Sequence, residues 1–220
     1  MSVDNQVGEG DGRGLTGAVP LTQRVLKAVS LQTGVELWSG AFGDDYTRRN
    51  QVEWRSRIAF WRKIIEQSTS ARSAFEMGAN AGWNLSAIRW INSDIIVRGN
   101  DINDQAAQQA RDAGLDVQTR IDFPNIGGKA ELVFTAGVLI HIEPEHVSEV
   151  MQALVDKSYR WVLAIEYAAD IETQVEYRGH TEKCWKRPYG ELYKALGLKL
   201  VESGDAGPGF DRCHYWLMEK

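Results

Sequence analysis

Residues 74–91 constrain the fold of this chain more than any other stretch. A short apolar run that contains Glu76 leads into Gly78 and Gly82, with Asn80 midway between them. Residues 83–91 then carry apolar side chains at helical spacing. The pattern predicts a strand, a tight turn and a helix, and glycine here favours a sharp turn that leaves room for a ligand. Because a helix begins with unpaired N–H groups, such a turn is a common ligand site in α/β proteins.

The spacing of the glycines argues against a dinucleotide. A pyrophosphate is bound by the pattern G-x-G-x-x-G, in which the backbone approaches the phosphate oxygens. Asn80 and Trp83 stand where the second and third glycines of that pattern would be. A tight turn without a ligand is the alternative that the residues leave open.

A second acid follows at the distance expected for ribose binding. Residues 94–102 predict a strand, and Asp101, followed by Ile102, stands roughly 20 positions after Gly78. An acid at this place accepts hydrogen bonds from ribose hydroxyls. The alternative is a solvated aspartate that caps the next helix, a role that Asn103 or Asp104 would serve as well.

The rest of the chain alternates between strand and helix patterns, and we expect an α/β fold of the Rossmann-like kind. Its sheet should have seven strands, mainly parallel, with one antiparallel edge strand and helices on both faces. Further strands are predicted at residues 115–120, 131–135, 159–167, 198–202 and 214–218, and helices at 51–66, 106–113, 144–157 and 188–196.

Composition and patterning divide the chain into three parts. Residues 1–20 are rich in glycine and are expected to form a disordered tail, residues 21–70 a helical lid and cap, and residues 71–220 the α/β domain with a substrate-loop insertion at about 168–188.

The net charge of −5 disfavours nucleic acid as a partner. No apolar run is long enough to cross a membrane, so we expect a cytoplasmic protein. Cys184 and Cys213 lack metal-ligand spacing, and no metal site is predicted.

Candidate catalytic side chains follow the fourth and fifth predicted strands. His141 lies just past the fourth strand, after Ala136 and Gly137, and Glu166 ends the fifth. Because open α/β sheets bind ligands at the carboxyl ends of their strands, both should lie near the glycine turn. The insertion adds three further candidates, and a salt-bridged flap is its alternative reading. These three are Tyr177, Arg178 and His180. His146, in a helical turn, is expected to be solvated.

At this point the chain resembles the class I methyltransferases, whose first motif is an acid-x-Gly-x-x-x-Gly turn. Within them it resembles the pseudaminic acid biosynthesis-associated methylase family over about residues 37–220. The resemblance is carried by residues 42–50, the glycine turn, and residues 134–142, 166–167, 177–180 and 215–220.

The resemblance implies S-adenosyl-L-methionine (SAM) as cofactor and assigns its contacts. Glu76, Gly78 and Gly82 would contact the methionine part, and Asp101 the ribose. Ile121 and Asp122 would contact the adenine, while Tyr46 and Arg49 would close over the cofactor from the N-terminal side. Asn80, Ile102, Ala136 and Gly137 complete the expected cofactor site.

The function predicted in this way is transfer of a methyl group to nitrogen or oxygen of a small polar acceptor. An amino-bearing metabolite or a modified sugar would suit the polar candidates, and a homodimer is possible. No Asn-Pro-Pro-Tyr type motif is present, which argues against methylation of base amines. The alternatives are a cofactor-binding scaffold without turnover and, less favoured because of Asn80, an NAD(P)-dependent oxidoreductase.

Overall fold

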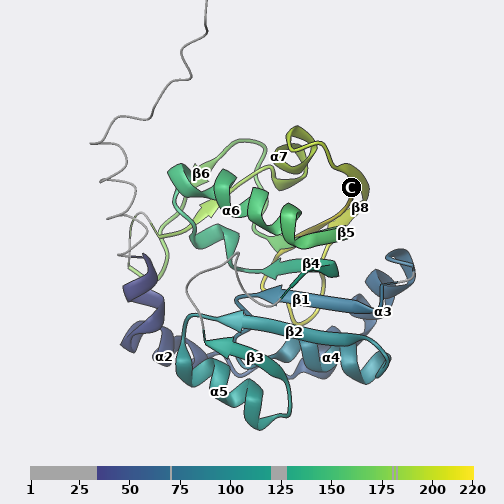
Figure 1. Cartoon of the computed structure of the whole chain (residues 1–220). Helices are drawn as coiled ribbons and strands as arrows, with labels where there is room; N and C mark the ends of the chain where they lie inside the picture. The colour runs from purple at the N-terminus through teal and green to yellow at the C-terminus, as the bar shows by residue number, and fades with distance from the viewer. Residues whose placement is uncertain (1–33, 70, 120–127, 180, 182) are drawn as a thin grey trace, which may run out of the picture.

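The computed structural model describes residues 34–69, 71–119, 128–179, 181 and 183–220. They form a seven-stranded sheet with helices on both faces (Figure 1). The expected tail at 1–20 lies outside the described residues. The strands of this sheet are β1 Ser73–Met77, β2 Ile96–Asp101, β3 Asp116–Thr119, β4 Ala130–Ala136, β5 Ser158–Glu166, β8 Lys199–Asp205 and β9 His214–Glu219.

The strand order is β3-β2-β1-β4-β5-β9-β8. The first five strands in this order pair in parallel, and β9 runs antiparallel to both β5 and β8. The predicted seven-stranded, mainly parallel sheet is therefore confirmed. Its one antiparallel strand, β9, lies second from the edge, between β5 and β8.

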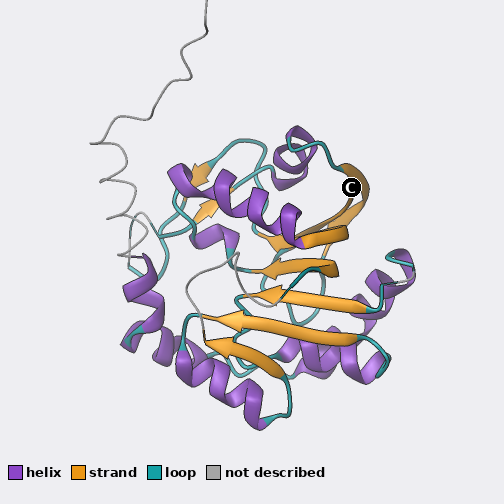
Figure 2. Ribbon diagram, in the orientation of Figure 1, coloured by secondary structure: helices purple, strands orange, loops and turns teal. Residues whose placement is uncertain are grey.

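Helices cover the two faces of the sheet and enclose two cores (Figure 2). On one face lie α3 (Ile58–Gln67), α4 (Trp83–Ile91) and α5 (Asp104–Asp112). On the other lie α6 (Pro144–Lys157) and α7 (Tyr189–Ala195). Strands β1, β4, β5 and β9 contribute to both cores because successive side chains point to opposite faces. None of the described helices is long and apolar enough to span a membrane.

The strand β5 shows how a continuous apolar sequence serves both cores. Trp161, Leu163 and Ile165 pack in the core with α3 and α4, whereas Val162 and Ala164 pack in the core with α6. A central strand that is covered on both faces needs apolar residues at every position.

Two segments differ from the expected elements. The predicted helix at 51–66 is divided into a short 3-10 helix, η1 (Trp54–Arg57), and α3, and the Glu53 side chain accepts a hydrogen bond from the Arg55 N–H at the start of η1. Residues 41–49, within the expected helical lid and cap, form the helix α2 (Ala41–Arg49). The insertion contains a small antiparallel pair, β6 (Thr173–Gln174) and β7 (Trp185–Lys186).

Candidate active site

The turn between β1 and α4 has a left-handed backbone at three positions. The φ angles are 72° at Gly78, 49° at Asn80 and 76° at Gly82. A Cβ atom on Gly78 would lie 2.4 Å from a methyl group of Val138, and one on Gly82 would lie 2.2 Å from a methyl group of Leu115. We expected these glycines to leave room for a ligand, but neighbouring side chains fill that room. The two glycines are required by backbone conformation and packing.

Asp101 joins this turn to the end of β2. Its Oδ2 accepts a hydrogen bond from the Asn80 N–H (2.7 Å), and its Oδ1 accepts one from the Asn103 N–H (2.8 Å). Only 8% of the residue is exposed, and burial raises the pKa of its carboxyl. The alternative reading of Asp101 as a solvated helix cap is wrong, because Asn103 caps α5 through the Ala106 N–H (2.9 Å).

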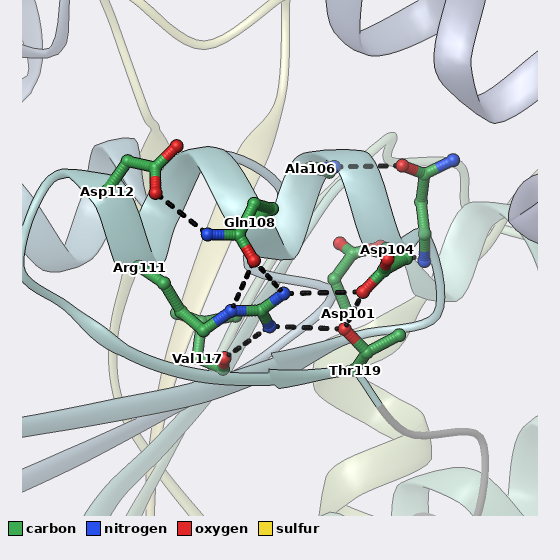
Figure 3. Close-up of polar contacts among 9 residues, drawn as sticks. Asp101, Asp104, Ala106, Gln108, Arg111, Asp112, Val117 and Thr119 are labelled. Carbon is green, nitrogen blue, oxygen red and sulfur yellow. Dashed lines mark hydrogen bonds and ion pairs between the residues drawn. The ribbon is translucent and has the colours of Figure 1, made fainter.

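Next to Asp101, a polar network fastens β3 to α5 (Figure 3). The Arg111 guanidinium donates to the Val117 carbonyl oxygen (3.1 Å) and to the Thr119 hydroxyl (3.2 Å), and pairs with Asp104 (3.3 Å). Thr119 also donates to Asp104 (2.7 Å). This network fixes the carboxyl end of β3. The predicted adenine contacts, Ile121 and Asp122, lie outside the described residues.

Glu76 lies beneath the turn and is only 1% exposed. Its Oε1 accepts a hydrogen bond from Asn84 Nδ2 (2.6 Å), whereas its Oε2 is buried without a partner. Asn84 Oδ1 in turn accepts hydrogen bonds from Arg57 Nη1 (2.8 Å) and Trp61 Nε1 (3.1 Å). Burial raises the pKa of Glu76 to about 8. The sequence reading missed Arg57 and Asn84, which no motif marks.

Helix α2 packs directly on the loops that follow β1 and β2. The Thr47 hydroxyl accepts a hydrogen bond from Asn80 Nδ2 (3.1 Å), and Asp44 Oδ1 accepts one from Asn103 Nδ2 (2.8 Å). Tyr46 is partly buried and meets the Trp38 ring edge-to-face, with centroids 5.3 Å apart. The structure thus brings Tyr46 to the site but leaves Arg49 exposed on the surface of α2.

His141 stands in an aromatic cluster at the same edge. Its ring lies 4.5 Å from the Trp38 ring and 4.8 Å from the Tyr177 ring, measured between centroids. His141 Nδ1 lies 2.6 Å from the Lys183 carbonyl oxygen, so Nδ1 carries the proton and Nε2 is an acceptor. Burial lowers the pKa of His141 to about 4, which keeps the ring neutral at pH 7.

The other two insertion candidates are Arg178 and His180. The Arg178 guanidinium lies 5.7 Å from the centroid of the Tyr177 ring. His180 lies outside the described residues. Of the two insertion candidates that the structure describes, Tyr177 is the one whose side chain contacts the His141 ring.

Glu166 supports the turn that carries His141. This turn is the short 3-10 helix η2 (Leu139–His141), and the backbone N–H groups of residues 138–140 donate to the Glu166 carboxyl at 3.2–3.3 Å. Glu166 is fully buried, and burial raises its pKa to about 7. Just before the turn, the Gly137 N–H donates to the Ile165 carbonyl oxygen (2.8 Å). The expectation that His146 is solvated is wrong, because its side chain is buried on α6.

Arg187, which the sequence reading did not select, holds the other side of η2. Its Nη1 donates to the Leu139 carbonyl oxygen (2.7 Å), its Nη2 to the Ile142 carbonyl oxygen (2.8 Å) and its Nε to Glu172 (2.6 Å). The side chain is fully buried. An acid therefore satisfies the N–H groups of the turn, and a guanidinium satisfies its carbonyl groups.

No protein-family profile and no curated protein matches the sequence. Solved structures do match it. Magnesium protoporphyrin IX methyltransferase from Synechocystis, with S-adenosylhomocysteine (SAH) bound, gives a TM-score of 0.67 at 14% identity over 87% of this chain and 99% of that one. A 1,6-didemethyltoxoflavin-N1-methyltransferase from Burkholderia thailandensis, with 1,6-didemethyltoxoflavin and SAH bound, gives a TM-score of 0.64 at 13% identity. The match covers 93% of this chain and 92% of that one. A sugar N-methyltransferase from Streptoalloteichus gives a TM-score of 0.60 at 12% identity, over 100% of this chain and 98% of that one.

These neighbours share the architecture of this chain across nearly their whole length. At 12–14% identity, the likeness shows a common fold and nothing narrower. The narrower resemblance to the pseudaminic acid-associated branch stays a prediction. The chain has the α/β Rossmann-like fold of the SAM-dependent methyltransferases.

Proposed function

We propose that this protein binds SAM and transfers its methyl group to nitrogen or oxygen of a small polar acceptor. The observation that carries the proposal is a pair of buried acids, Glu76 on β1 and Asp101 at the end of β2, on either side of the glycine turn. Buried acids are costly unless they have partners, and Glu76 Oε2 has none among the residues that the structure describes. An amino group for Glu76 and ribose hydroxyls for Asp101 would complete the hydrogen bonding of both.

Asp101 keeps acceptor capacity for a ribose. Its oxygens accept the backbone N–H groups of Asn80, Ile102 and Asn103, whereas a carboxylate offers about four lone-pair sites. The backbone contacts also fix the carboxyl group in place, so ribose hydroxyls would meet an ordered acceptor.

His141 is the group best suited to receive a proton from the acceptor. SAM would supply an electrophilic methyl carbon bonded to a sulfonium, and an acceptor nitrogen or oxygen would displace the thioether from it. The nucleophile loses one proton as the new bond forms, and His141 Nε2 is a neutral acceptor with its ring fixed by the Lys183 carbonyl. Much of the acceleration in such a displacement comes from holding the reactants in line.

The acceptor is proposed to be a modified sugar or an amino-bearing metabolite. Tyr177 borders His141, and the Arg178 guanidinium lies beside the Tyr177 ring, so the two offer an aromatic surface with a cation next to it. Structural neighbours that act on a porphyrin, a toxoflavin precursor and a sugar support a small-molecule acceptor. Glu166 and Arg187, which do not reach the surface, act in this proposal by positioning η2.

The proposal is tested first by calorimetry with SAM, its product S-adenosylhomocysteine (SAH), and NAD⁺. We expect heat with the two adenosyl ligands and none with NAD⁺. The purified protein is then given methyl-labelled SAM and a panel of amino sugars and hydroxylated metabolites, and both label transfer and SAH formation are followed. Binding without transfer to any acceptor would favour the scaffold alternative, and absence of binding would refute the proposal.

Asp101→Ala is expected to weaken SAH binding by about 1.5–3 kcal/mol, because charge-assisted hydrogen bonds to the ribose are lost. Asp112→Ala is the matched control, since Asp112 accepts a hydrogen bond from Gln108 on the exposed side of α5. Calorimetry with SAH should show unchanged affinity for the control. Equal affinities for wild type and Asp101→Ala, both folded by circular dichroism, would contradict the ribose assignment.

A further inference from the structure

The network around Asn84 leaves two ionisable side chains with unused hydrogen-bonding capacity. Glu76 Oε2 is buried without a partner. Arg57 donates through Nε to the Gly209 carbonyl oxygen (2.9 Å) and through Nη1 to Asn84 Oδ1 (2.8 Å). Among the described residues, none accepts a hydrogen bond from Arg57 Nη2. Asn84 therefore separates an acid from a guanidinium, each with one position unused.

The Arg57 guanidinium is held beside the glycine turn. It lies 4.5 Å from the Phe210 ring centroid and 6.0 Å from that of Trp83, the residue directly after Gly82. Its charge interacts with both Glu76 and Tyr46, which places it close to the residues proposed to contact the cofactor. Residue Arg57 as a whole is only 9% exposed, so its position is restricted by packing on several sides.

We propose that Arg57 binds the α-carboxylate of the cofactor while Glu76 binds its α-ammonium group, an inference that rests on the proposed function. The amino-acid end of SAM or SAH carries these two opposite charges on one carbon. The side-chain amide of Asn84 hydrogen-bonds to both Arg57 and Glu76, so a single amide group separates the two side chains. The two charged groups of one α-amino acid can bridge such a span. Guanidinium groups bind carboxylates through directed N–H donors, and Nη2 supplies the unused ones.

Arg57 would then determine specificity as well as affinity. A ligand that lacks the carboxylate leaves the unused Nη2 donors of Arg57 without an ionic partner. Nucleosides without the amino-acid end should therefore bind weakly. A purely structural role, in which Arg57 only ties the Gly209 turn to α4, predicts no such discrimination.

The test uses three ligands that differ only at this end. They are SAH, decarboxylated SAH, which keeps the amine, and methylthioadenosine, which lacks both charged groups. By calorimetry, the wild-type protein should bind SAH about ten- to hundredfold more tightly than decarboxylated SAH. Similar affinities for these two ligands would overturn the inference while leaving SAM binding itself intact. Absence of SAH binding would overturn the proposed function and the inference together.

Arg57→Met should weaken SAH by about ten- to hundredfold and leave the affinity for decarboxylated SAH unchanged within about twofold. Arg55→Met is the matched control, because Arg55 lies on the same short helix with its side chain exposed; it should bind all three ligands as wild type does. Equal weakening of all three ligands by Arg57→Met would show an indirect, structural role. Should Arg57→Met fail to fold, the wild-type ligand series decides alone.

Discussion

Replacing Arg187 with methionine is expected to lower the free energy of unfolding by about 2–6 kcal/mol, because two carbonyl groups lose their donors at about 1–3 kcal/mol each. The side chain is fully buried, and three of its nitrogens donate to three different acceptors. Methionine fills part of the volume but donates to none of them. The carbonyl groups of Leu139 and Ile142 would be left without their donors, and each unsatisfied group costs free energy.

Arg160→Met is the matched control for this prediction. Arg160 also pairs with a glutamate, Glu219, through two nitrogens at 2.7 and 2.9 Å, but its side chain is half exposed. Exposed ion pairs contribute roughly 0–1 kcal/mol, so urea unfolding should show a much smaller loss for this variant. Arg187→Lys keeps the positive charge but lacks the planar guanidinium with its several N–H donors, and it should recover only part of the stability. Equal losses for Arg187→Met and Arg160→Met would contradict the role assigned to Arg187.

The loss should be local as well as global. Arg187 and Glu166 hold opposite sides of η2, so removing one should loosen the turn that carries His141. Amide hydrogen exchange of Leu139 and Ile140 is expected to become faster in Arg187→Met. The same amides should exchange at wild-type rates in Arg160→Met.

The sheet and its order of elements could be predicted because their signals are local. Three such signals each lie within a few residues of the sequence: the apolar run of β5, the proline that begins α6 and the glycine turn before α4. The division of residues 51–66 could not be predicted from apolar spacing. At the division, Arg57 donates to Asn84 and to the Gly209 carbonyl oxygen, and these partners are distant in sequence.

The candidate site shows the same limit more sharply. Glu76 and Asp101 were selected from the glycine turn and the spacing that follows it, and His141 because it follows the fourth predicted strand. The structure brings all three to the ligand-binding edge, with Glu76 in β1, Asp101 at the end of β2 and His141 in η2. Arg187 was not selected, since its partner Leu139 is 48 positions away and nothing in the surrounding sequence marks it. The glycines were expected to leave open space, but only the folded packing reveals that Val138 and Leu115 take it.

The stability of the protein is expected to fall as pH rises from about 5 to about 9, because two buried carboxyls must lose their protons. Burial raises the pKa of Glu166 from 4.5 to about 7 and that of Glu76 from 4.5 to about 8. The folded protein therefore holds these protons more tightly than the unfolded chain does. The stabilisation is complete below pH 4.5 and is lost as pH rises through the two folded-state values.

Glu76→Gln separates the contribution of Glu76 from all others. Glutamine resembles the protonated acid, and its side-chain oxygen can still accept from Asn84 Nδ2. Each pKa unit corresponds to about 1.4 kcal/mol, so the variant should gain on the order of several kcal/mol relative to wild type between acidic and alkaline pH. Urea unfolding across this range measures the difference. Glu191→Gln, which removes an exposed carboxyl on α7, should keep the wild-type slope. If Glu76→Gln also kept that slope, Glu76 would already be ionised in the folded protein, and a neighbouring cation, with Arg57 the nearest candidate, would have to compensate its buried charge.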